Sequence, residues 1–222
     1  MQALQAQIGT TAQAVGEHAG KVIELAVGAS LPGFVMRFER NEEIFAEEEE
    51  ADFVYKVVSG VVRDVRVLSD GRRQIGAFHL PGEVFGFEDS GAHRHTAEAV
   101  VDCEIALVRR AAVERLVDAD TGAARSLWSL TARDLSQLQD HMLLLARKSA
   151  VERVAAFLIR MSARAGDEAF DLPMSRNDIA DHLGLTIETV SRTFTQLERR
   201  GAISLPSARR VVLHERIALL DE

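Results

Sequence analysis

The sequence predicts an α+β fold, in which a domain of short strands precedes a long helix and a second, mainly helical domain. Three observations carry this prediction. Short runs rich in β-branched residues and separated by turn signals occupy about residues 34–108. Apolar residues recur with the period of a helix over residues 121–147, and two short helical patterns around a glycine fill residues 178–194. Strands that come first and helices that follow are typical of an α+β protein or of two separate domains.

The composition is that of a globular chain without disulfide bonds. The 222 residues are enough for one large domain or two modest ones, and 47% hydrophobic with 27% charged residues is ordinary for a soluble protein. No apolar run approaches the ~18 residues of a membrane span, and we expect no signal peptide, because no basic region precedes an apolar block. Cys103 is the only cysteine, which excludes an intrachain disulfide and favours a reducing cytoplasm.

Charge is distributed unevenly along the chain. The net charge of −8 argues against a nucleic-acid partner at first sight. The first 145 residues hold 14 basic and 23 acidic side chains, however, whereas residues 146–222 hold 12 and 11. Residues 192–210 contain five arginines and a single acid, Glu198. Because salt limits exposed charges to a range of ~8–10 Å, this local patch matters more than the total, and the C-terminal part is the one expected to face a polyanion.

The N-terminal part is predicted to contain a short arm and a domain of strands. Residues 1–20 are weakly patterned, and we expect a helical arm there. Residues 21–117 are predicted to form a β-roll or a sandwich, because short strands at this spacing favour those folds. One or two of the strands lie within residues 95–108. Turn signals separate the earlier strands at Ser59-Gly60, Asp70-Gly71 and Pro81-Gly82.

One long helix is predicted over residues 118–147, and its apolar pattern favours pairing with a second copy of the chain. Six residues recur at alternating steps of three and four, which makes a heptad seam: Trp128, Thr131, Leu135, Leu138, Met142 and Leu145. The alternative is a helix that packs on its own domain. A second apolar set can face the strand domain and leave the seam for a partner helix: Leu127, Leu130, Leu143 and Leu144. We therefore expect a homodimer.

Residues 148–222 are predicted to hold an amphipathic helix over 151–161, a pair of short helices and a hairpin. Ser175 is a good N-cap for the first helix of the pair, and Asp178 completes a variant of the capping box. Gly184 suits a left-handed C-terminal cap. Thr186 is then expected to cap the second helix.

The second helix of the pair has one apolar face and one polar face. Val190, Phe194 and Leu197 recur at helical spacing and are expected to be buried. This leaves four residues exposed in the first two turns, namely Ile187, Glu188, Ser191 and Arg192. Helices that read DNA use their N-terminal residues, with arginine donating to guanine and a carboxylate accepting from cytosine. The alternative is a core hairpin whose Glu188 and Arg192 form a surface ion pair worth ~0.3–0.5 kcal/mol.

The segment after Gly201 reads as strand, turn and strand. A hairpin behind a helix-turn-helix makes a winged helix. Arg209 and Arg210 lie at the tip of this hairpin or just beyond it, where arginines would meet phosphate. The alternative is a solvated basic turn.

These motifs closely resemble the CRP/FNR family of bacterial transcription regulators over about residues 34–214. "SRNDIADHLGLTIETVSRTFTQLERRGAI" resembles the helix-turn-helix of that family, and "VYKVVSGVVRDVRVLSDGRRQIGAFHLPGEVFG" resembles its cyclic-nucleotide-binding-type β-roll, a jelly roll. "SAVERVAAFLIRMS" resembles the linker helix that follows the dimerisation helix. Glu188, Ser191 and Arg192 match the FNR and FixK version of the pattern, whereas the catabolite activator branch has arginine at the place of Ile187. The most similar branch is that of the FixK-like regulators.

The resemblance implies double-stranded DNA and RNA polymerase as partners, a homodimer with a long dimerisation helix, and a location on the nucleoid in the bacterial cytoplasm. It implies an activator of microaerobic, respiratory or nitrogen-fixation genes that reads TTGA…TCAA palindromes, with half-sites ~10 bp apart. Arg192 would contact the guanine, Glu188 the cytosine opposite it, and Ser191 a neighbouring base. Five residues would contact phosphates, namely Ser175, Thr186, Thr189, Arg209 and Arg210.

The sequence departs from the effector-binding members of the family. A cyclic-nucleotide site needs a Gly-Glu-Leu turn and an Arg-Ser-Ala run, whereas Gly86 is followed by Phe87 and the later run is Arg94-His95-Thr96. An iron–sulfur cluster needs four cysteine ligands, which excludes it here. We expect Cys103 to be a buried strand residue, with a redox role as the alternative. FixK-like regulators generally work without an effector, so no cofactor is expected.

Two other classes of function remain as alternatives. The first is a ligand-gated sensor of the same family that binds a small molecule or haem, with His79, His93 and His95 as candidate ligands. The second is an enzyme that uses His93, Arg94 and His95 beside Glu88 and Asp89. No nucleophile motif, phosphate loop or metal spacing supports the second class, so we do not expect an enzyme.

Overall fold

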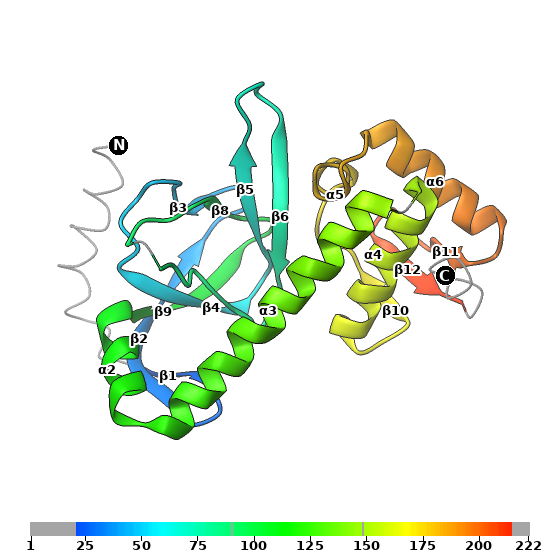
Figure 1. The fold of residues 1–222 in the computed structure, drawn as a ribbon. Helices are drawn as coiled ribbons and strands as arrows, with labels where there is room; N and C mark the ends of the chain where they lie inside the picture. The colour runs from blue at the N-terminus through cyan, green and yellow to red at the C-terminus, as the bar shows by residue number, and fades with distance from the viewer. Residues whose placement is uncertain (1–20, 90, 148, 215–222) are drawn as a thin grey trace.

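The computed structural model of the chain describes residues 21–89, 91–147 and 149–214. The arm predicted over residues 1–20 lies outside them. Figure 1 shows a β-roll on one side, the long helix α3 running diagonally from it, and a smaller helical domain beyond α3. The predicted fold class is therefore confirmed. No helix within the described ranges is long and apolar enough to cross a membrane.

The β-roll consists of two antiparallel sheets. Their orders are β1-β2-β9-β4-β7 and β3-β8-β5-β6. The strands begin at Lys21, earlier than the β-branched runs indicated, and all of the predicted turns are present. The bounds are β1 (Lys21–Ala26), β2 (Ala29–Phe38), β3 (Glu43–Phe45), β4 (Phe53–Ser59), β5 (Val62–Val67), β6 (Arg73–His79), β7 (Val84–Phe85), β8 (Thr96–Ala99) and β9 (Cys103–Arg109).

Cys103 is a buried residue of the roll, as expected. Its Sγ lies 2.9 Å from the Val101 carbonyl oxygen and 3.2 Å from that of Val61, and either oxygen can accept the one hydrogen bond of the thiol. Gly60, at φ 85°, passes so close that a Cβ there would lie 2.5 Å from the Cys103 Sγ. Burial raises the pKa of the thiol, which keeps it protonated and weakly reactive. This environment supports the structural interpretation of Cys103 over the redox one.

The helical domain follows the roll through two helices. Asp120 ends α2 and starts α3, because its carboxylate accepts hydrogen bonds from the backbone amides of Gly122 at 2.7 Å and Ala123 at 3.2 Å. The elements are α2 (Arg110–Ala119), α3 (Thr121–Arg147), α4 (Ala150–Ala165), β10 (Ala169–Asp171), α5 (Arg176–Leu183), α6 (Ile187–Arg199), β11 (Ile203–Ser204) and β12 (Arg210–Leu213).

Helix α3 packs on this chain by only part of its surface. Leu127 and Leu130 pack against the roll, and Leu144 joins a core that the helical domain shares with the roll. Leu143, in contrast, is 54% exposed, so the expectation that it faces the strand domain is wrong. Four residues of the predicted seam are exposed large side chains, namely Trp128, Leu135, Leu138 and Met142. Thr131 is exposed as well, whereas Leu145 is partly buried against the helical domain.

The roll and the helical domain share one apolar core. Val61, Val65 and Ile75 of the roll belong to the same buried cluster as Leu183 of α5 and Phe194 of α6. Strand β6 lies beside α5 in Figure 1, where the hairpin of β5 and β6 stands against the helical domain. The helical domain is therefore seated on the roll by packing as well as by the long helix.

Two stacked histidines at this junction predict that the protein loses stability in mild acid. His141 of α3 and His182 of α5 stack with their ring centroids 4.2 Å apart. Burial lowers the pKa of His141 to about 4 and that of His182 to about 3. Between the ordinary histidine pKa of ~6.5 and pH 4, these two residues are protonated in the unfolded chain but neutral in the folded chain. The free energy of unfolding therefore falls as the pH falls towards 4.

We expect a loss of up to about 1.4 kcal/mol per pH unit for each of these histidines, measured by urea unfolding between pH 7 and pH 5. The variant His182→Gln should flatten that profile, because glutamine does not titrate. The same replacement of the exposed His214 is the control for the loss of a histidine in general. Other groups also titrate in this window: burial opposes the charge of His95, but its contact with Asp64 raises the pKa of His95, so that residue adds stability as the pH falls. A slope that His182→Gln leaves unchanged would therefore contradict the prediction.

Candidate nucleic-acid interface

The predicted caps of the helix pair are all formed. Ser175 is the N-cap of α5 and shares a capping box with Asp178, and Gly184 ends α5 in the left-handed conformation at φ 62°. Thr186 caps α6, where its hydroxyl oxygen accepts a hydrogen bond from the backbone amide of Thr189 at 3.2 Å. Local signals therefore fix both helix ends and the turn between them.

Helix α6 buries one face and exposes the other. Val190, Phe194 and Leu197 are at most 2% exposed, as predicted. The side chain of Thr193 is also buried and donates a hydrogen bond to the Thr189 carbonyl oxygen at 2.8 Å. The four residues predicted to face outwards are all exposed, namely Ile187, Glu188, Ser191 and Arg192. A surface hollow follows them along the helix, lined by Ser191, Arg192, Thr195, Gln196, Arg199 and Arg200.

Glu188 and Arg192 are not engaged with each other. No ion pair joins them in the described part of the chain, and the Arg192 Nη2 lies 3.5 Å from the Thr189 hydroxyl oxygen. Hydrogen bonds from its own backbone amide and from Thr186 hold the pKa of Glu188 below its usual range, and the charge of Arg192 contributes less. Glu188 is therefore an ionised hydrogen-bond acceptor, and the Arg192 guanidinium keeps donors for a ligand.

Arg176 joins the two helices and the hairpin, which sequence reasoning missed. Its guanidinium carbon lies 3.3 Å from the ring centroid of Phe194, a cation–π contact between α5 and α6. Its Nη2 also approaches the Ala208 carbonyl oxygen of the hairpin at 3.5 Å. Burial lowers the pKa of Arg176 to about 10, so it stays charged. No sequence pattern indicated this contact, because Arg176 directly follows the N-cap of α5 and Phe194 lies in the next helix.

The hairpin of β11 and β12 is joined by β10, which makes a three-stranded sheet in the order β10-β12-β11. Arg209 is exposed in the turn, and its backbone amide donates to the Ser207 hydroxyl oxygen at 3.4 Å. Arg210 begins β12, and its Nη1 is 3.1 Å from a carboxylate oxygen of Asp171 on β10. The two arginines therefore differ, because the structure gives an ion pair only for Arg210 in the described region.

Of the candidate haem ligands in the roll, His93 is buried, whereas His79 and His95 are partly exposed. The Nε2 atoms of His79 and His95 lie 2.8 Å and 3.3 Å from the same carboxylate oxygen of Asp64. The ring of His93 stacks on that of Phe45, with 3.5 Å between the centroids. Within the described residues, no three or more His, Cys, Asp and Glu side chains are grouped so that they could hold a metal ion. Each of the three histidines thus contacts another side chain of the roll, Asp64 for two of them and Phe45 for the third.

Comparison with known proteins agrees with this architecture. A family model described as "Crp-like helix-turn-helix domain" matches residues 152–222, and one described as "Cyclic nucleotide-binding domain" matches residues 35–120. The nitrogen fixation regulation protein FixK of Azorhizobium caulinodans is 50% identical over 188 residues, which cover 82% of this chain and 76% of that protein.

A second relative and a solved structure extend the match. The transcriptional activatory protein AadR of Rhodopseudomonas palustris is 40% identical over 84% of this chain and 77% of its own length. The structure of FixK2 from Bradyrhizobium japonicum matches with a TM-score of 0.82 and 49% identity, over 86% of this chain and 98% of that one.

The helix-turn-helix match and the relatives, which are transcription regulators and not enzymes, place the chain among transcription regulators with a helix-turn-helix DNA-binding domain. The chain belongs to the CRP/FNR family, in its FixK-like branch.

Proposed function

We propose that the protein is a homodimeric regulator, an activator, that reads TTGA…TCAA palindromes without a bound effector. The observation that carries this proposal is the exposed trio Glu188, Ser191 and Arg192 on the first two turns of α6. The opposite face of the helix is buried, so packing does not explain these three side chains. Base-reading helices use this part of the helix, and the trio matches the FixK pattern.

Each member of the trio has a chemical role in the proposal. Arg192 donates two hydrogen bonds to the O6 and N7 atoms of guanine, and Glu188 accepts one from the N4 amino group of the opposite cytosine. Ser191 contacts a neighbouring base. The ionised state of Glu188 supports its role, because only an acceptor fits cytosine N4.

Phosphate contacts position the helix pair on the duplex. We assign them to Thr186, Thr189, Arg209 and Arg210, which lie at the start of α6 and in the hairpin. Ser175 has less support among the residues expected to do this. Its hydroxyl donates to an Asp178 carboxylate oxygen at 2.7 Å, and its amide donates to the same atom at 3.0 Å. Both of its donors are thus used within the protein.

The exposed seam on α3 supports the proposed homodimer. Trp128 is 75% exposed and Met142 64%, in a helix whose other side already packs on the roll. Large apolar side chains at a heptad spacing pair with a second helix of the same kind. Two copies related by a two-fold axis would present their α6 helices to half-sites ~34 Å apart, one turn of DNA.

The cellular context is proposed from the relatives. FixK of Azorhizobium caulinodans is named for regulation of nitrogen fixation, and AadR is named a transcriptional activatory protein. We propose that this protein likewise acts in the cytoplasm on genes of microaerobic respiration or nitrogen fixation, with RNA polymerase as its partner.

A footprint on a TTGA…TCAA promoter, with purified protein and no added ligand, tests the proposal. We expect protection of both half-sites, and loss of protection when the guanine of each half-site is changed. Protection that appears only after a ligand is added would contradict effector-independent binding.

A ligand-gated sensor is the second candidate, and one observation favours it. The ring of His93 is buried inside the roll, and neither of its nitrogens lies within hydrogen-bond distance of a described residue, although its Nδ1 is 3.6 Å from a Glu88 carboxylate oxygen. Bound haem would appear in the absorption spectrum of the purified protein, and a small-molecule effector would appear as ligand-dependent protection in the footprint.

The two hairpin arginines are expected to contribute unequally to DNA binding. Arg209→Ala should weaken binding to all sequences alike and lower the slope of log K against log salt by about one. Arg210→Ala should have a smaller effect, because the carboxylate of Asp171 already partly neutralises the guanidinium of Arg210. The measurement is a salt titration of binding to cognate and random DNA. A larger change for Arg210→Ala would contradict this order.

A further inference from the structure

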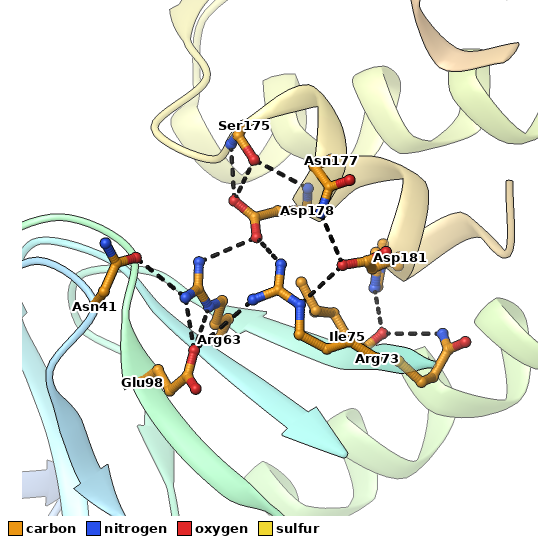
Figure 2. Close-up of polar contacts among 11 residues, drawn as sticks. Asn41, Arg63, Arg73, Ile75, Glu98, Ser175, Asn177, Asp178 and Asp181 are labelled. Atoms are coloured by element: carbon orange, nitrogen blue, oxygen red, sulfur yellow. Dashed lines mark hydrogen bonds and ion pairs between the residues drawn. The ribbon is translucent and has the colours of Figure 1, made fainter. Parts of the chain in front are cut away.

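A cluster of charged residues joins the β-roll to the helix-turn-helix, and it centres on the carboxylate of Asp178 (Figure 2). One oxygen of this carboxylate caps α5 by accepting from the amide and hydroxyl of Ser175. The other oxygen accepts from the Arg63 Nη1 at 3.0 Å and from the Arg73 Nη2 at 2.6 Å. Asp178, which completes the capping box at the start of α5, is thus also bound by two arginines of the roll.

Contacts within the roll hold the Arg63 side chain in place independently of Asp178. It is only 7% exposed, and its Nε and Nη2 donate to one Glu98 carboxylate oxygen at 2.8 Å and 2.6 Å. Arg63 and Glu98 are direct neighbours across strands β5 and β8. The Nη2 also donates to the Asn41 side-chain oxygen at 3.2 Å. The roll therefore presents this guanidinium in a fixed direction, as a planar fork of donors allows.

Arg73 adds a second point of attachment on α5. Its Nε donates to an Asp181 carboxylate oxygen at 2.9 Å, while its Nη2 binds Asp178. A third point is the His182 Nδ1, which lies 3.1 Å from the Ile75 carbonyl oxygen of β6. Asp178, Asp181 and His182 share one face of the helix, because residues three and four apart are neighbours. Three contacts on one face fix both the rotation and the tilt of α5.

The cluster is suited to fixing an orientation more than to adding stability. Burial opposes the ionisation of Asp178, but hydrogen bonds from Ser175 and the nearby guanidinium groups hold its pKa below the usual value. Buried ion pairs add little net stability after desolvation, although their geometry is demanding. Helix α6 packs on α5 through the shared core, so a fixed α5 also fixes α6.

We infer that Arg63 and Arg73 are positioning residues for DNA binding: they hold the helix-turn-helix in one orientation on the roll without touching DNA. This inference rests on the proposed function. In the proposed dimer, the contacts set the direction and separation of the two α6 helices. Side chains of the roll thereby fix the orientation of the helix-turn-helix, so that no bound effector is needed to fix it.

Arg73 is the residue to test, because its side chain is 30% exposed and its replacement leaves the cap of α5 intact. The variants are Arg73→Gln, Asp181→Asn and the double variant in the full-length protein. The matched control is Arg72→Gln, since Arg72 is adjacent and pairs only with Asp70 of the hairpin turn among the ion pairs described. Melting curves and circular dichroism check that each variant folds.

Two measurements report orientation. The first is the distribution of distances between spin labels on the roll and on α6 within one subunit, without DNA, for which we expect one narrow peak in the wild type and a broad one in Arg73→Gln. The second is affinity for palindromes with the natural spacer and with one base pair added. Arg73→Gln should lose about threefold to thirtyfold on the natural spacer and little on the longer one, so that the preference between them shrinks. The double variant should be no worse than Arg73→Gln.

The outcomes separate the two proposals. A wild-type protein that does not bind the palindrome overturns the proposed function, and with it the role of these arginines in DNA binding. A wild type that binds, with a distance distribution or spacer preference that Arg73→Gln leaves unchanged, overturns this inference alone. An equal loss on both spacers would also overturn it, because that loss would mark a merely structural role.

Discussion

Replacement of Arg192 by alanine is expected to cost about 1–3 kcal/mol of binding free energy on a TTGA…TCAA site and to relax the preference for guanine at one position. Arg192 is exposed on α6 and is not paired with Glu188, so its guanidinium is available for the base. The measurement is a set of affinities for the cognate site, for sites with the guanine replaced, and for random DNA.

Arg199→Ala is the matched control for this prediction. Arg199 is an exposed arginine of the same helix and lines the same surface hollow, but it lies at the C-terminal end, away from the base-reading turns. Its loss should weaken binding slightly and alike on all three DNAs, through charge alone. Equal losses on cognate and random DNA for Arg192→Ala would exclude a base contact by Arg192.

Replacement of Leu138 by glutamate is expected to convert the proposed dimer into a monomer and to lower affinity for the full palindrome by about 10²–10⁴-fold. Leu138 is 54% exposed in the centre of the α3 seam, where a charge would be buried against the partner helix. Sedimentation measures the oligomeric state, and affinity for a single half-site should change far less than affinity for the palindrome.

Leu143→Glu provides a control with the same chemistry. Leu143 is also 54% exposed on α3, but it lies one residue beyond the seam position Met142 and so points away from the seam. We expect this variant to remain a dimer and to bind the palindrome normally. A Leu138→Glu variant that stays dimeric would show that another surface joins the two copies.

The sequence predicted the helix pair well because its signals are short-range. A cap, a turn glycine or an amphipathic period acts over a few residues, and Ser175, Gly184 and Thr186 all adopt the predicted conformations. The apolar pattern of α3 was less informative. It identified Leu127 as a buried residue correctly and Leu143 wrongly, because a periodic stripe does not say which neighbour covers it.

The amino-acid sequence by itself determined the fold class, the helix ends and the exposed trio on α6, since each depends on residues close together in the chain. Only the tertiary structure decided what else Asp178 does. Its role as a capping residue was predicted, whereas its contact with Arg63 joins residues 115 positions apart. Opposite charges attract at any separation in sequence, so no local pattern selects the pair. The packing of the roll on α5 brings them together, and this packing is what orients the helix proposed to read DNA.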